Sequence, residues 1–311
     1  MIKYLVTGGA GFIGSNIVEE LVKRGQFVRV LDNLSTGFIE NLAPFKDKIE
    51  FQEGDIRDEN DVKKAVKGMD YVIHQAALRS VALSVEQPLP TNDVNVNGSL
   101  NVLIQSKEAG VKRLVYASSS SAYGDCAEFP QREDMNPVPI SPYGVSKLTA
   151  ELYARMFTAT MGLETVSLRY FNVFGPRQNP ESKYSAVIPA FIAMLAKNEP
   201  CTIDSDGKQS RDFTYVGNVV DANLAACSAP GAAGMVFNVA CNEDHSVNDI
   251  AESLKKIMKK DIKSVFGPKR HGDVIRTWAD ISLMKKYLKI EPRVKFYEGL
   301  EKTVEWFVTK K

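Results

Sequence analysis

Strand-sized apolar runs alternate with helix-like segments through the first half of the chain, and this alternation constrains the fold more than any other feature. The runs comprise residues 4–6, 27–31, 49–51, 71–73, 114–116 and 165–168. Amphipathic stretches such as residues 13–24 separate them. Short buried strands joined by helices pair in parallel through right-handed crossovers, with helices on both faces of one sheet. The pattern therefore predicts an α/β protein with a Rossmann-type doubly wound parallel sheet, whose ligands bind beyond the carboxyl ends of the strands.

The rhythm of strands and helices changes after about residue 172. Residues 175–180, Gly-Pro-Arg-Gln-Asn-Pro, are typical of a loop, and later elements come less regularly. We therefore expect a Rossmann domain over residues 1–171, with a return segment near 213–241. A smaller C-terminal α/β domain is expected over residues 172–311, where it binds substrate.

Two elements of the later half can be predicted individually. The apolar run 236–240 is a candidate for one more strand that returns to the sheet. Ser246 and Asp249 form a variant of the capping box, which predicts the start of a helix over residues 246–259.

Charge and composition exclude several classes of protein. The chain has 311 residues, with 39 Lys and Arg against 38 Asp and Glu, and this balance leaves no electrostatic footprint for nucleic acid or an anionic membrane. Its apolar runs are strand-sized, so none is expected to cross a bilayer. The first residues already enter a strand, so we expect no secretory signal and a cytoplasmic protein. Four cysteines without paired spacing and three histidines predict neither disulfides nor a metal site.

A glycine turn follows the first expected strand and opens the first helix. Gly8, Gly11 and Gly14 are spaced G-x-x-G-x-x-G, one residue looser than the common dinucleotide fingerprint. Glycine permits a tight turn, close approach of backbone amides to a diphosphate, and a helix N-terminus aimed at that charge. Asp32 ends the second expected strand, where a carboxylate accepts hydrogen bonds from the adenosine ribose and repels a 2′-phosphate. The pattern predicts a dinucleotide site that prefers NAD over NADP.

The ends of the third and fourth expected strands complete this site. Asp55 lies where an adenine ring would rest, and it either accepts a hydrogen bond from the exocyclic amine or begins the next turn. Ala76 and Ala77 are small enough to let a cofactor approach the backbone. His74, just before them, is interpreted as a hydrogen-bonded core or strand-end residue rather than a catalyst.

A tyrosine and a lysine four residues apart form the second motif. Tyr143 and Lys147 are expected on one face of a helix that Ser141 caps and that Pro142 opens. An ammonium group ~4 Å from the phenol, at an effective dielectric constant of ~20, would favour the phenolate by ~4 kcal/mol, or about three pKa units. The spacing therefore predicts an activated phenolate with a lowered pKa.

Four serines, Ser118 to Ser121, follow the fifth expected strand. Their hydroxyls either relay a proton between a substrate hydroxyl and Tyr143 or simply make a polar loop. No Asp or Glu lies between Ser118 and Tyr123. This part of the site consequently offers no carboxylic acid for the elimination of water.

Taken together, these motifs resemble those of the extended short-chain dehydrogenase/reductases, and specifically of the UDP-hexose 4-epimerases, over essentially the whole chain. The motifs are TGGAGFIGS, DNLSTG, GDIRD, HQAA, SSSSAYG, SPYGVSK, LRYFNVFGPRQ, SRDFTYV and RHGDV. The resemblance implies a Rossmann domain that holds NAD tightly and a C-terminal domain that binds a UDP-sugar. It also implies a homodimer through helices near residues 94–107 and 145–157, unless these helices pack their apolar stripes on the sheet.

The resemblance also implies roles for individual residues. Tyr143 would be the base and Lys147 would orient it and the nicotinamide ribose, while Ser120 or its neighbour Ser119 would hydrogen-bond the 4-hydroxyl of the sugar. The implied cofactor-binding residues are Gly8, Gly11, Phe12, Ile13, Gly14, Asp32, Asn33, Asp55, Ile56, Gln75, Ala76, Ala77, Tyr143, Lys147 and Val173. The implied substrate-binding residues are Arg79, Ser120, Ser121, Asn172, Ala186, Val187, Thr202, Arg211, Arg270, Asp273 and Thr277. For Arg211, a surface ion pair with Asp212 is the alternative.

Two positions bear on the choice of sugar. By the resemblance, Arg79 stands where relatives restricted to plain hexoses carry Lys and N-acetyl specialists carry Gly, and Thr277 stands where a small residue admits an N-acetyl group. We therefore expect activity on the UDP-glucose and UDP-galactose pair, with tolerance for UDP-N-acetylglucosamine and UDP-N-acetylgalactosamine. UDP-glucuronate is a further alternative, with Arg79 as the carboxylate partner. The implied reaction passes through a transient 4-keto sugar that rotates before it is reduced on its other face.

Two other functional hypotheses are alternatives to epimerisation. A dehydratase or decarboxylase of the same fold would carry an acid where Ser120 and Ser121 stand. A non-catalytic NAD(H)-binding regulator would usually lack the pair formed by Tyr143 and Lys147.

Overall fold

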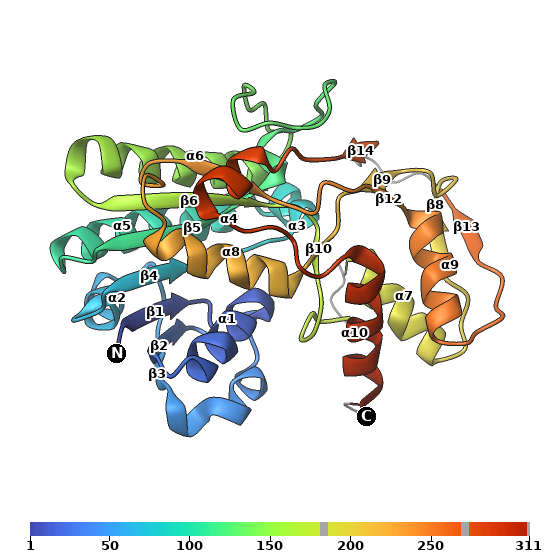
Figure 1. Ribbon diagram of the computed structural model, residues 1–311, viewed down its shortest axis with the longest axis horizontal. Helices are drawn as coiled ribbons and strands as arrows, with labels where there is room; N and C mark the ends of the chain where they lie inside the picture. Colours follow the sequence, from blue (N-terminus) through green and yellow to red (C-terminus); the bar gives the residue numbers. More distant parts are fainter. Residues whose placement is uncertain (181–185, 269–273, 310–311) are drawn as a thin grey trace.

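The computed structural model describes residues 1–180, 186–268 and 274–309, which form a larger and a smaller lobe (Figure 1). The larger lobe is built on a seven-stranded sheet in the order β11-β6-β5-β4-β1-β2-β3, with every neighbouring pair parallel. Its strands are β1 (Lys3–Thr7), β2 (Phe27–Asp32), β3 (Glu50–Glu53), β4 (Tyr71–His74), β5 (Arg113–Ser119), β6 (Glu164–Tyr170) and β11 (Val236–Val239). The predicted Rossmann-type fold class is confirmed.

Helices cover both faces of this sheet. They are α1 (Phe12–Lys23), α2 (Glu59–Val66), α3 (Val81–Glu86), α4 (Pro88–Asn92), α5 (Ser99–Glu108), α6 (Pro142–Met156) and α8 (Val216–Ser228). Side chains of β1 alternate between two hydrophobic cores: Tyr4 and Val6 join the core under α1 and α8, and Leu5 joins the core under α2, α5 and α6. Burial on both faces explains why these strands are continuously apolar in the sequence.

The smaller lobe lies beside the sheet and contains α7, α9 and α10 (Figure 1). Its elements are β7 (Val173–Phe174), α7 (Val187–Ala196), β8 (Thr202–Asp204), β9 (Ser210–Arg211), β10 (Thr214–Tyr215), β12 (His245–Ser246), α9 (Val247–Ile257), β13 (Val265–Gly267), β14 (Arg276–Thr277) and α10 (Phe296–Thr309). Phe174, Phe213 and Phe296 meet at its centre, with ring centroids 5.7–6.4 Å apart. This lobe therefore has a hydrophobic core of its own.

Two predicted elements of the later half are present. β11 pairs in parallel with β6, so the chain returns to the large sheet after building part of the smaller lobe. Helix α9 begins with the predicted capping box of Ser246 and Asp249 and ends at Ile257, two residues before the predicted end. Short 3-10 helices span Ile39–Asn41, Ala43–Lys48 and Ser120–Ala122, and π-helical turns span Asp93–Gly98, Phe157–Met161 and Met284–Leu288.

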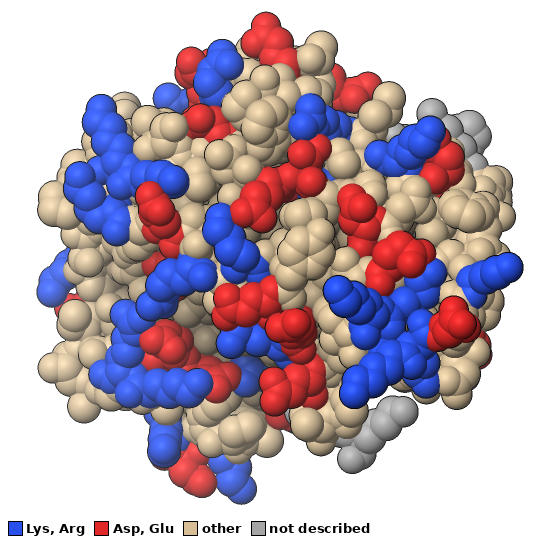
Figure 2. All heavy atoms as spheres, turned by 45° about the vertical axis from the view of Figure 1, so that its right-hand side comes forward, with Lys and Arg blue, Asp and Glu red and all other residues tan. Residues whose placement is uncertain are grey.

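The distribution of charged side chains and the state of the cysteines can be described directly from the structure. Basic and acidic side chains are interspersed over the face drawn in Figure 2. All four cysteines are free thiols. Within the ranges that the structure describes, no helix has the length and apolar character needed to cross a membrane, and no three His, Cys, Asp or Glu side chains gather as they would around a metal ion.

Candidate active site

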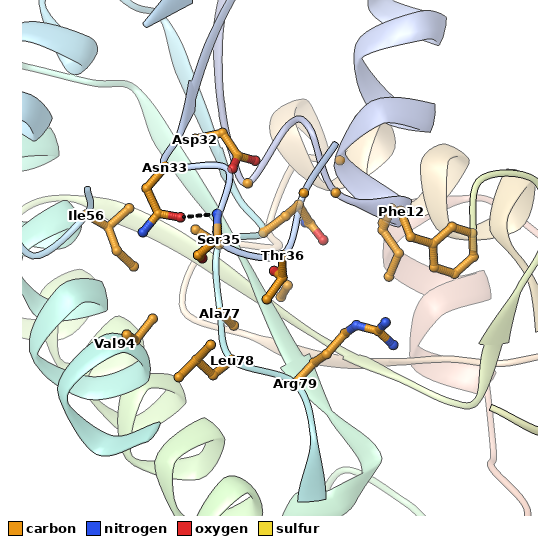
Figure 3. Close-up of a pocket in the computed structure, with 18 of the residues that line it drawn as sticks. Phe12, Asp32, Asn33, Ser35, Thr36, Ile56, Ala77, Leu78, Arg79 and Val94 are labelled. Carbon is orange, nitrogen blue, oxygen red and sulfur yellow. Dashed lines mark hydrogen bonds between the residues drawn. The ribbon is translucent and has the colours of Figure 1, made fainter. Parts of the chain in front are cut away.

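A cavity of about 360 Å³ opens at the carboxyl ends of the parallel strands, where the strand order reverses around β1. This is the position at which doubly wound sheets bind ligands. Figure 3 shows part of its wall, with Asp32 and Phe12 on one side and Ala77, Leu78 and Arg79 on the other. Every residue expected at the cofactor lines the cavity except Val173, which lies in β7 outside the lining.

The glycine turn at the base of the cavity has no room for side chains. Gly8 has a left-handed φ of 69°, and a Cβ atom there would lie 2.7 Å from the backbone nitrogen of Ala76. A Cβ atom on Gly14 would lie 2.2 Å from the carbonyl oxygen of Gly8. Gly11 is the N-cap of α1, so the positive end of that helix faces the cavity. The turn fits the diphosphate of a dinucleotide, because its glycines let that group approach the backbone and the helix N-terminus closely.

Asp32 lies in the cavity wall with its carboxylate held by the backbone. Its Oδ2 accepts a hydrogen bond from the Ala10 amide at 2.9 Å, and its Oδ1 accepts one from the Leu34 amide at 2.8 Å. Burial raises the pKa of Asp32 above its ordinary value, and the two backbone hydrogen bonds offset part of that rise. The carboxylate thus caps the strand-end turn and also faces the cavity, where its remaining lone pairs can accept from a ribose.

Asp55 is engaged by its own surroundings. Arg57 contacts it through Nη2 at 2.8 Å, and Asn33 donates to its Oδ2, also at 2.8 Å. The hydrogen bond from Arg57 holds the pKa of Asp55 far below its ordinary value. Asp55 also accepts from the backbone amide of Arg57. It therefore begins the turn, as one of the two predicted alternatives has it, while still lining the cavity.

Tyr143 and Lys147 lie on α6, which Ser141 caps by accepting a hydrogen bond from the Gly144 amide at 3.1 Å. Lys147 is 4% exposed, and its Nζ donates to the carbonyl of Ala117 at 2.9 Å. Burial lowers the pKa of Lys147 to about 7. Both side chains reach the cavity, as the four-residue spacing predicts.

The expected direction of the Tyr143 pKa is wrong. Burial raises this pKa above its ordinary value of 10.0, while a hydrogen bond from Ser119 and the positive charge of Arg79 lower it in part. Lys147 donates to a backbone carbonyl and does not oppose the effect of burial. The helical spacing was a sound guide to position, but it carried no information on desolvation.

The serines after β5 have separate partners. Ser118 lines the cavity, and its hydroxyl donates to the buried carboxylate of Glu151 at 2.6 Å. The Ser119 hydroxyl lies beside the Tyr143 phenol and accepts a hydrogen bond from the backbone amide of Ser121. Ser120 and Ser121 open the short 3-10 helix and do not line the cavity. Of the two serines expected at the 4-hydroxyl, Ser119 is the one that the fold brings to Tyr143.

His74 has a structural environment. Its Nδ1 is 2.7 Å from the hydroxyl oxygen of Thr7, and its Nε2 is 2.9 Å from that of Ser99. Burial, together with the nearby charge of Lys147, lowers the pKa of His74 to about 3. The imidazole is therefore neutral, and its interpretation as a hydrogen-bonded core residue is confirmed.

Two residues that are expected to bind substrate, Asn172 and Arg211, lie where the two lobes meet (Figure 1). Asn172 donates from its Nδ2 to Thr277 Oγ1 and to the carbonyl of Asp212, both at 3.0 Å. Arg211 donates to the carbonyl oxygens of Ser210 and Val274. These contacts fix β9 and β14 side by side.

Asp212 is fully buried, so it does not form a surface ion pair with Arg211. Its carboxylate accepts hydrogen bonds from the backbone amides of Cys241 at 2.8 Å and Ala279 at 3.4 Å. Burial raises the pKa of Asp212 to about 7, although the backbone hydrogen bonds offset part of the rise. Asp212 therefore joins the segments that follow β11 and β14.

The other described residues that are expected to bind substrate lie outside the lining of the cavity, apart from Arg79. Ala186 is the N-cap of α7 and Val187 its first residue, and Thr202 is an exposed residue of β8 that pairs with Val265. Arg270 and Asp273 lie outside the described residues. Among the described substrate residues, only Arg79 lines the cavity, and its side chain is exposed.

Several residues of the cavity wall were not singled out from the sequence. They are Leu31, Ser35, Thr36, Gly37, Phe38, Asn41, Gly54, Arg57, Leu78, Pro90, Val94, Ala117, Tyr170, Arg177 and Asn179. Part of this wall follows Asp32 directly in the DNLSTG motif. A loop that follows a strand-end carboxylate is therefore a sequence signal for further residues of the cavity wall. Arg177 and Asn179 come from the distant GPRQN loop, and no local pattern links that loop to the first strand.

Comparison with known proteins identifies the family. The profile of the NAD dependent epimerase/dehydratase family matches residues 4–240. A putative UDP-glucose 4-epimerase of Methanocaldococcus jannaschii is 38% identical over 97% of both chains. The crystal structure of Thermotoga maritima UDP-glucose 4-epimerase with UDP-glucose is 39% identical, covers 99% of both chains and has a TM-score of 0.95.

A third similar protein binds a different sugar nucleotide. The UDP-N-acetylglucosamine 4-epimerase of Methanobrevibacter ruminantium, in complex with UDP-N-acetylmuramic acid, is 40% identical with a TM-score of 0.95 over 100% of this chain and 99% of that one. Relatives at 35% and 31% identity are named UDP-glucuronate 4-epimerase and UDP-N-acetyl-alpha-D-glucosaminuronate decarboxylase.

The doubly wound sheet, the glycine turn at the α1 N-terminus and the strand-end Asp32 define a dinucleotide-binding protein of the Rossmann class. The chain belongs to the NAD dependent epimerase/dehydratase family, and NAD is its cofactor.

Proposed function

We propose that this protein is an isomerase that interconverts UDP-sugars at carbon 4 with NAD as a bound, recycled cofactor. One observation carries the proposal: Ser119 and Tyr143 meet beside the dinucleotide cavity, at a strand end that has no carboxylic acid between Ser118 and Tyr123. The 4-epimerase names of similar proteins over the full chain length support it.

Proton transfer is assigned to Tyr143. Its phenolic oxygen takes the proton of the 4-hydroxyl and later returns it, while the Ser119 hydroxyl holds both groups in hydrogen-bonding reach. The chemistry that bound NAD would supply is reversible acceptance of the hydride of carbon 4. Since burial raises the Tyr143 pKa, ionisation of the phenol depends on the positive groups around it, and Arg79 supplies one of them.

Lys147 is assigned the orientation of the cofactor ribose. Its Nζ is anchored on the Ala117 carbonyl at the end of β5, so two further donor directions remain toward the cavity. Ser118 and Ala117 line the same part of the wall.

Substrate binding is assigned to the junction of the lobes. We propose a Rossmann domain over residues 1–171, with the return segment near 213–241, and a nucleotide-sugar domain over residues 172–311. Asn172 and Arg211 would contact the diphosphate, with Arg270 and Asp273 as further ligands from outside the described residues. Ser121, Ala186, Val187, Thr202 and Thr277 would form the walls around the sugar and uridine, and Val173 would approach the cofactor.

For the sugar itself, we propose the UDP-glucose and UDP-galactose pair, with tolerance for the N-acetylated pair. The exposed guanidinium of Arg79 faces the cavity and favours hydroxyl-rich sugars, while Thr277 is small. Arg79 would equally receive the carboxylate of UDP-glucuronate, which makes that sugar the second candidate.

We also propose that the protein is a homodimer formed through α5 and α6. Val145, Leu152 and Met156 share one face of α6 and are 49%, 52% and 37% exposed, and Ile104 on α5 is 36% exposed. Ala150 and Ala154 face the sheet instead, so this apolar stripe is not covered within the chain. Sedimentation should give twice the monomer mass, and Leu152→Glu should reduce it to one chain; a monomer in the unaltered protein would refute the proposal.

Incubation of the purified protein with a panel of UDP-sugars tests the proposed function. Proton NMR of the anomeric signals should show conversion of UDP-glucose and UDP-galactose into each other, with no change in mass. A product lighter by one water or one carbon dioxide would instead identify a dehydratase or a decarboxylase. No conversion of any sugar, with NAD bound, would favour a regulator.

A further inference from the structure

A buried ion pair lies directly behind the proposed catalytic groups. Glu151 on α6 and Arg169 on β6 are 1% and 3% exposed. Arg169 Nη2 donates to Glu151 Oε1 at 2.6 Å, and its Nε donates to Glu151 Oε2 at 3.0 Å. The same Oε2 accepts the hydroxyl of Ser118, on β5, at 2.6 Å. One carboxylate therefore joins a helix and two neighbouring strands.

The positions of these groups along the chain tie them to the site. Glu151 follows Tyr143 by two helical steps of four residues, with Lys147 between them, so all three share one face of α6. Ser118 immediately precedes Ser119, and Ser118 is the register partner of Arg169 in the β5–β6 pair. The Glu151 contacts are therefore connected to Tyr143 along the helix and to Ser119 along the strand.

The contacts continue from Arg169 toward the smaller lobe. The Arg169 guanidinium lies 4.5 Å from the centre of the Tyr123 ring, and the Tyr123 hydroxyl donates to Asn238 at 2.7 Å. Asn238 in turn donates to the carbonyls of Gln131 at 2.9 Å and Asp280 at 3.1 Å. Ser118, Tyr123, Glu151, Arg169 and Asn238 therefore form one connected set, which we call the Glu151 network.

A contribution to stability alone does not account for the two buried charges of Glu151 and Arg169. Removing two charges from water is costly, and well-packed apolar residues of similar volume are often as stable or more so. A bidentate arginine–carboxylate pair differs from apolar packing because it fixes orientation as well as distance. Orientation is what a hydrogen bond between Ser119 and Tyr143 requires.

We propose that Glu151 and Arg169 are positioning residues that hold the strand end carrying Ser119 against the helix carrying Tyr143. The inference rests on the proposed function, because it assigns those two residues to the reacting hydroxyl. Neither Glu151 nor Arg169 lines the cavity. Their effect is on the hydride-transfer step, through the geometry of Ser119 and Tyr143.

The test uses Ser118→Ala and Glu151→Gln in the NAD-loaded protein. Ser118→Ala removes one buried hydroxyl and leaves the ion pair intact, so it is the milder change. Ser167→Ala is the matched control: Ser167 is a 1% exposed serine on the adjacent strand β6, and its hydroxyl has no hydrogen-bond partner in the described part of the chain. Turnover, KM, bound NAD per chain and the ultraviolet absorbance of the reduced cofactor during turnover are measured for each protein.

We expect Ser118→Ala to lower kcat by between about tenfold and a hundredfold, the range for a small misplacement of reacting groups. KM and NAD content should stay as in the unaltered protein, and less reduced cofactor should accumulate. Glu151→Gln should lower kcat at least as far, and Ser167→Ala should leave it unchanged. A kcat within twofold for folded Ser118→Ala would overturn the proposal. So would a loss of kcat that follows only a loss of NAD, or one equalled by Ser167→Ala.

Failure of the proposed function can be distinguished from failure of the positioning proposal. If the unaltered protein converts no UDP-sugar, that function is wrong, and crystal structures of the unaltered protein and Ser118→Ala then decide the positioning proposal. Ser119 Oγ and Tyr143 Oη should be in hydrogen-bonding reach in the first structure and separated in the second. Equal separation in both would refute it.

Discussion

Replacing Lys147 with methionine is expected to stabilise the protein at acidic and neutral pH. Lys147 is 4% exposed, and burial lowers its pKa from 10.5 to about 7. The unfolded chain therefore binds a proton between these two values that the folded chain does not bind. For such a group, stability is lowest below the folded pKa and rises with pH toward the unfolded one.

The magnitude follows from the two pKa values. A difference of 10.5 − 7 corresponds to about 5 kcal/mol of destabilisation below the folded pKa, and about 2 kcal/mol remains at pH ~9. Methionine removes this cost but leaves the Ala117 carbonyl without its donor, which costs about 1–3 kcal/mol. The variant should thus be more stable by roughly 2–4 kcal/mol at pH ~6, and the gain should shrink by about 3 kcal/mol on going to pH ~9.

Urea denaturation of both proteins across this pH range, without added nucleotide, measures the difference. Lys147→Met should have lost most of its turnover, because the proposed contact with the cofactor is gone. A variant that is less stable at acidic pH, or a difference that does not change with pH, would refute the reasoning and show that the buried amine keeps its ordinary pKa.

Three further outcomes are expected. Tyr143→Phe should retain NAD but lose at least about a hundredfold in turnover, measured by NMR with UDP-galactose; unchanged turnover would remove the proposed base. Gly14→Ala should abolish NAD binding or folding, because its Cβ atom would lie 2.2 Å from the Gly8 carbonyl oxygen, and circular dichroism with a bound-nucleotide assay distinguishes the two. Arg79→Gln should raise the Tyr143 pKa and move the activity that requires phenolate to higher pH, since the Arg79 charge lowers that pKa; an unmoved pH–kcat/KM profile would contradict it.

The large sheet could be predicted from the sequence because its signal is local and repeated. Each strand is a short apolar run, and side chains such as Tyr4, Leu5 and Val6 are apolar in succession because the strand is covered on both faces. The glycine turn and Asp32 were equally predictable, since their spacing reflects one unit of two strands, β1 and β2, joined by the turn and α1. The smaller lobe was less so, because two-residue strands such as β9 and β14 are too short to carry a period.

The electrostatics of the site could not be predicted from spacing. The position of Lys147 relative to Tyr143 follows from helix geometry, but the direction of the Tyr143 pKa depends on how much protein surrounds the phenol. In the same way, the pairing of Asp55 with Arg57 depends on side-chain conformation. The choice of Ser119 over Ser120 required the bend of the chain after β5, where a 3-10 helix begins.

The late return of the chain to the large sheet, through β11, affects how the protein folds during its synthesis. During synthesis β6 emerges from the ribosome long before β11, which pairs with it and follows α7, β8 and α8 in the chain. Until β11 arrives, β6 presents an unpaired edge, the kind of surface on which unrelated chains associate. A nascent chain stalled between these two strands is therefore expected to need a chaperone, and the burden should end once Val239 has left the exit tunnel.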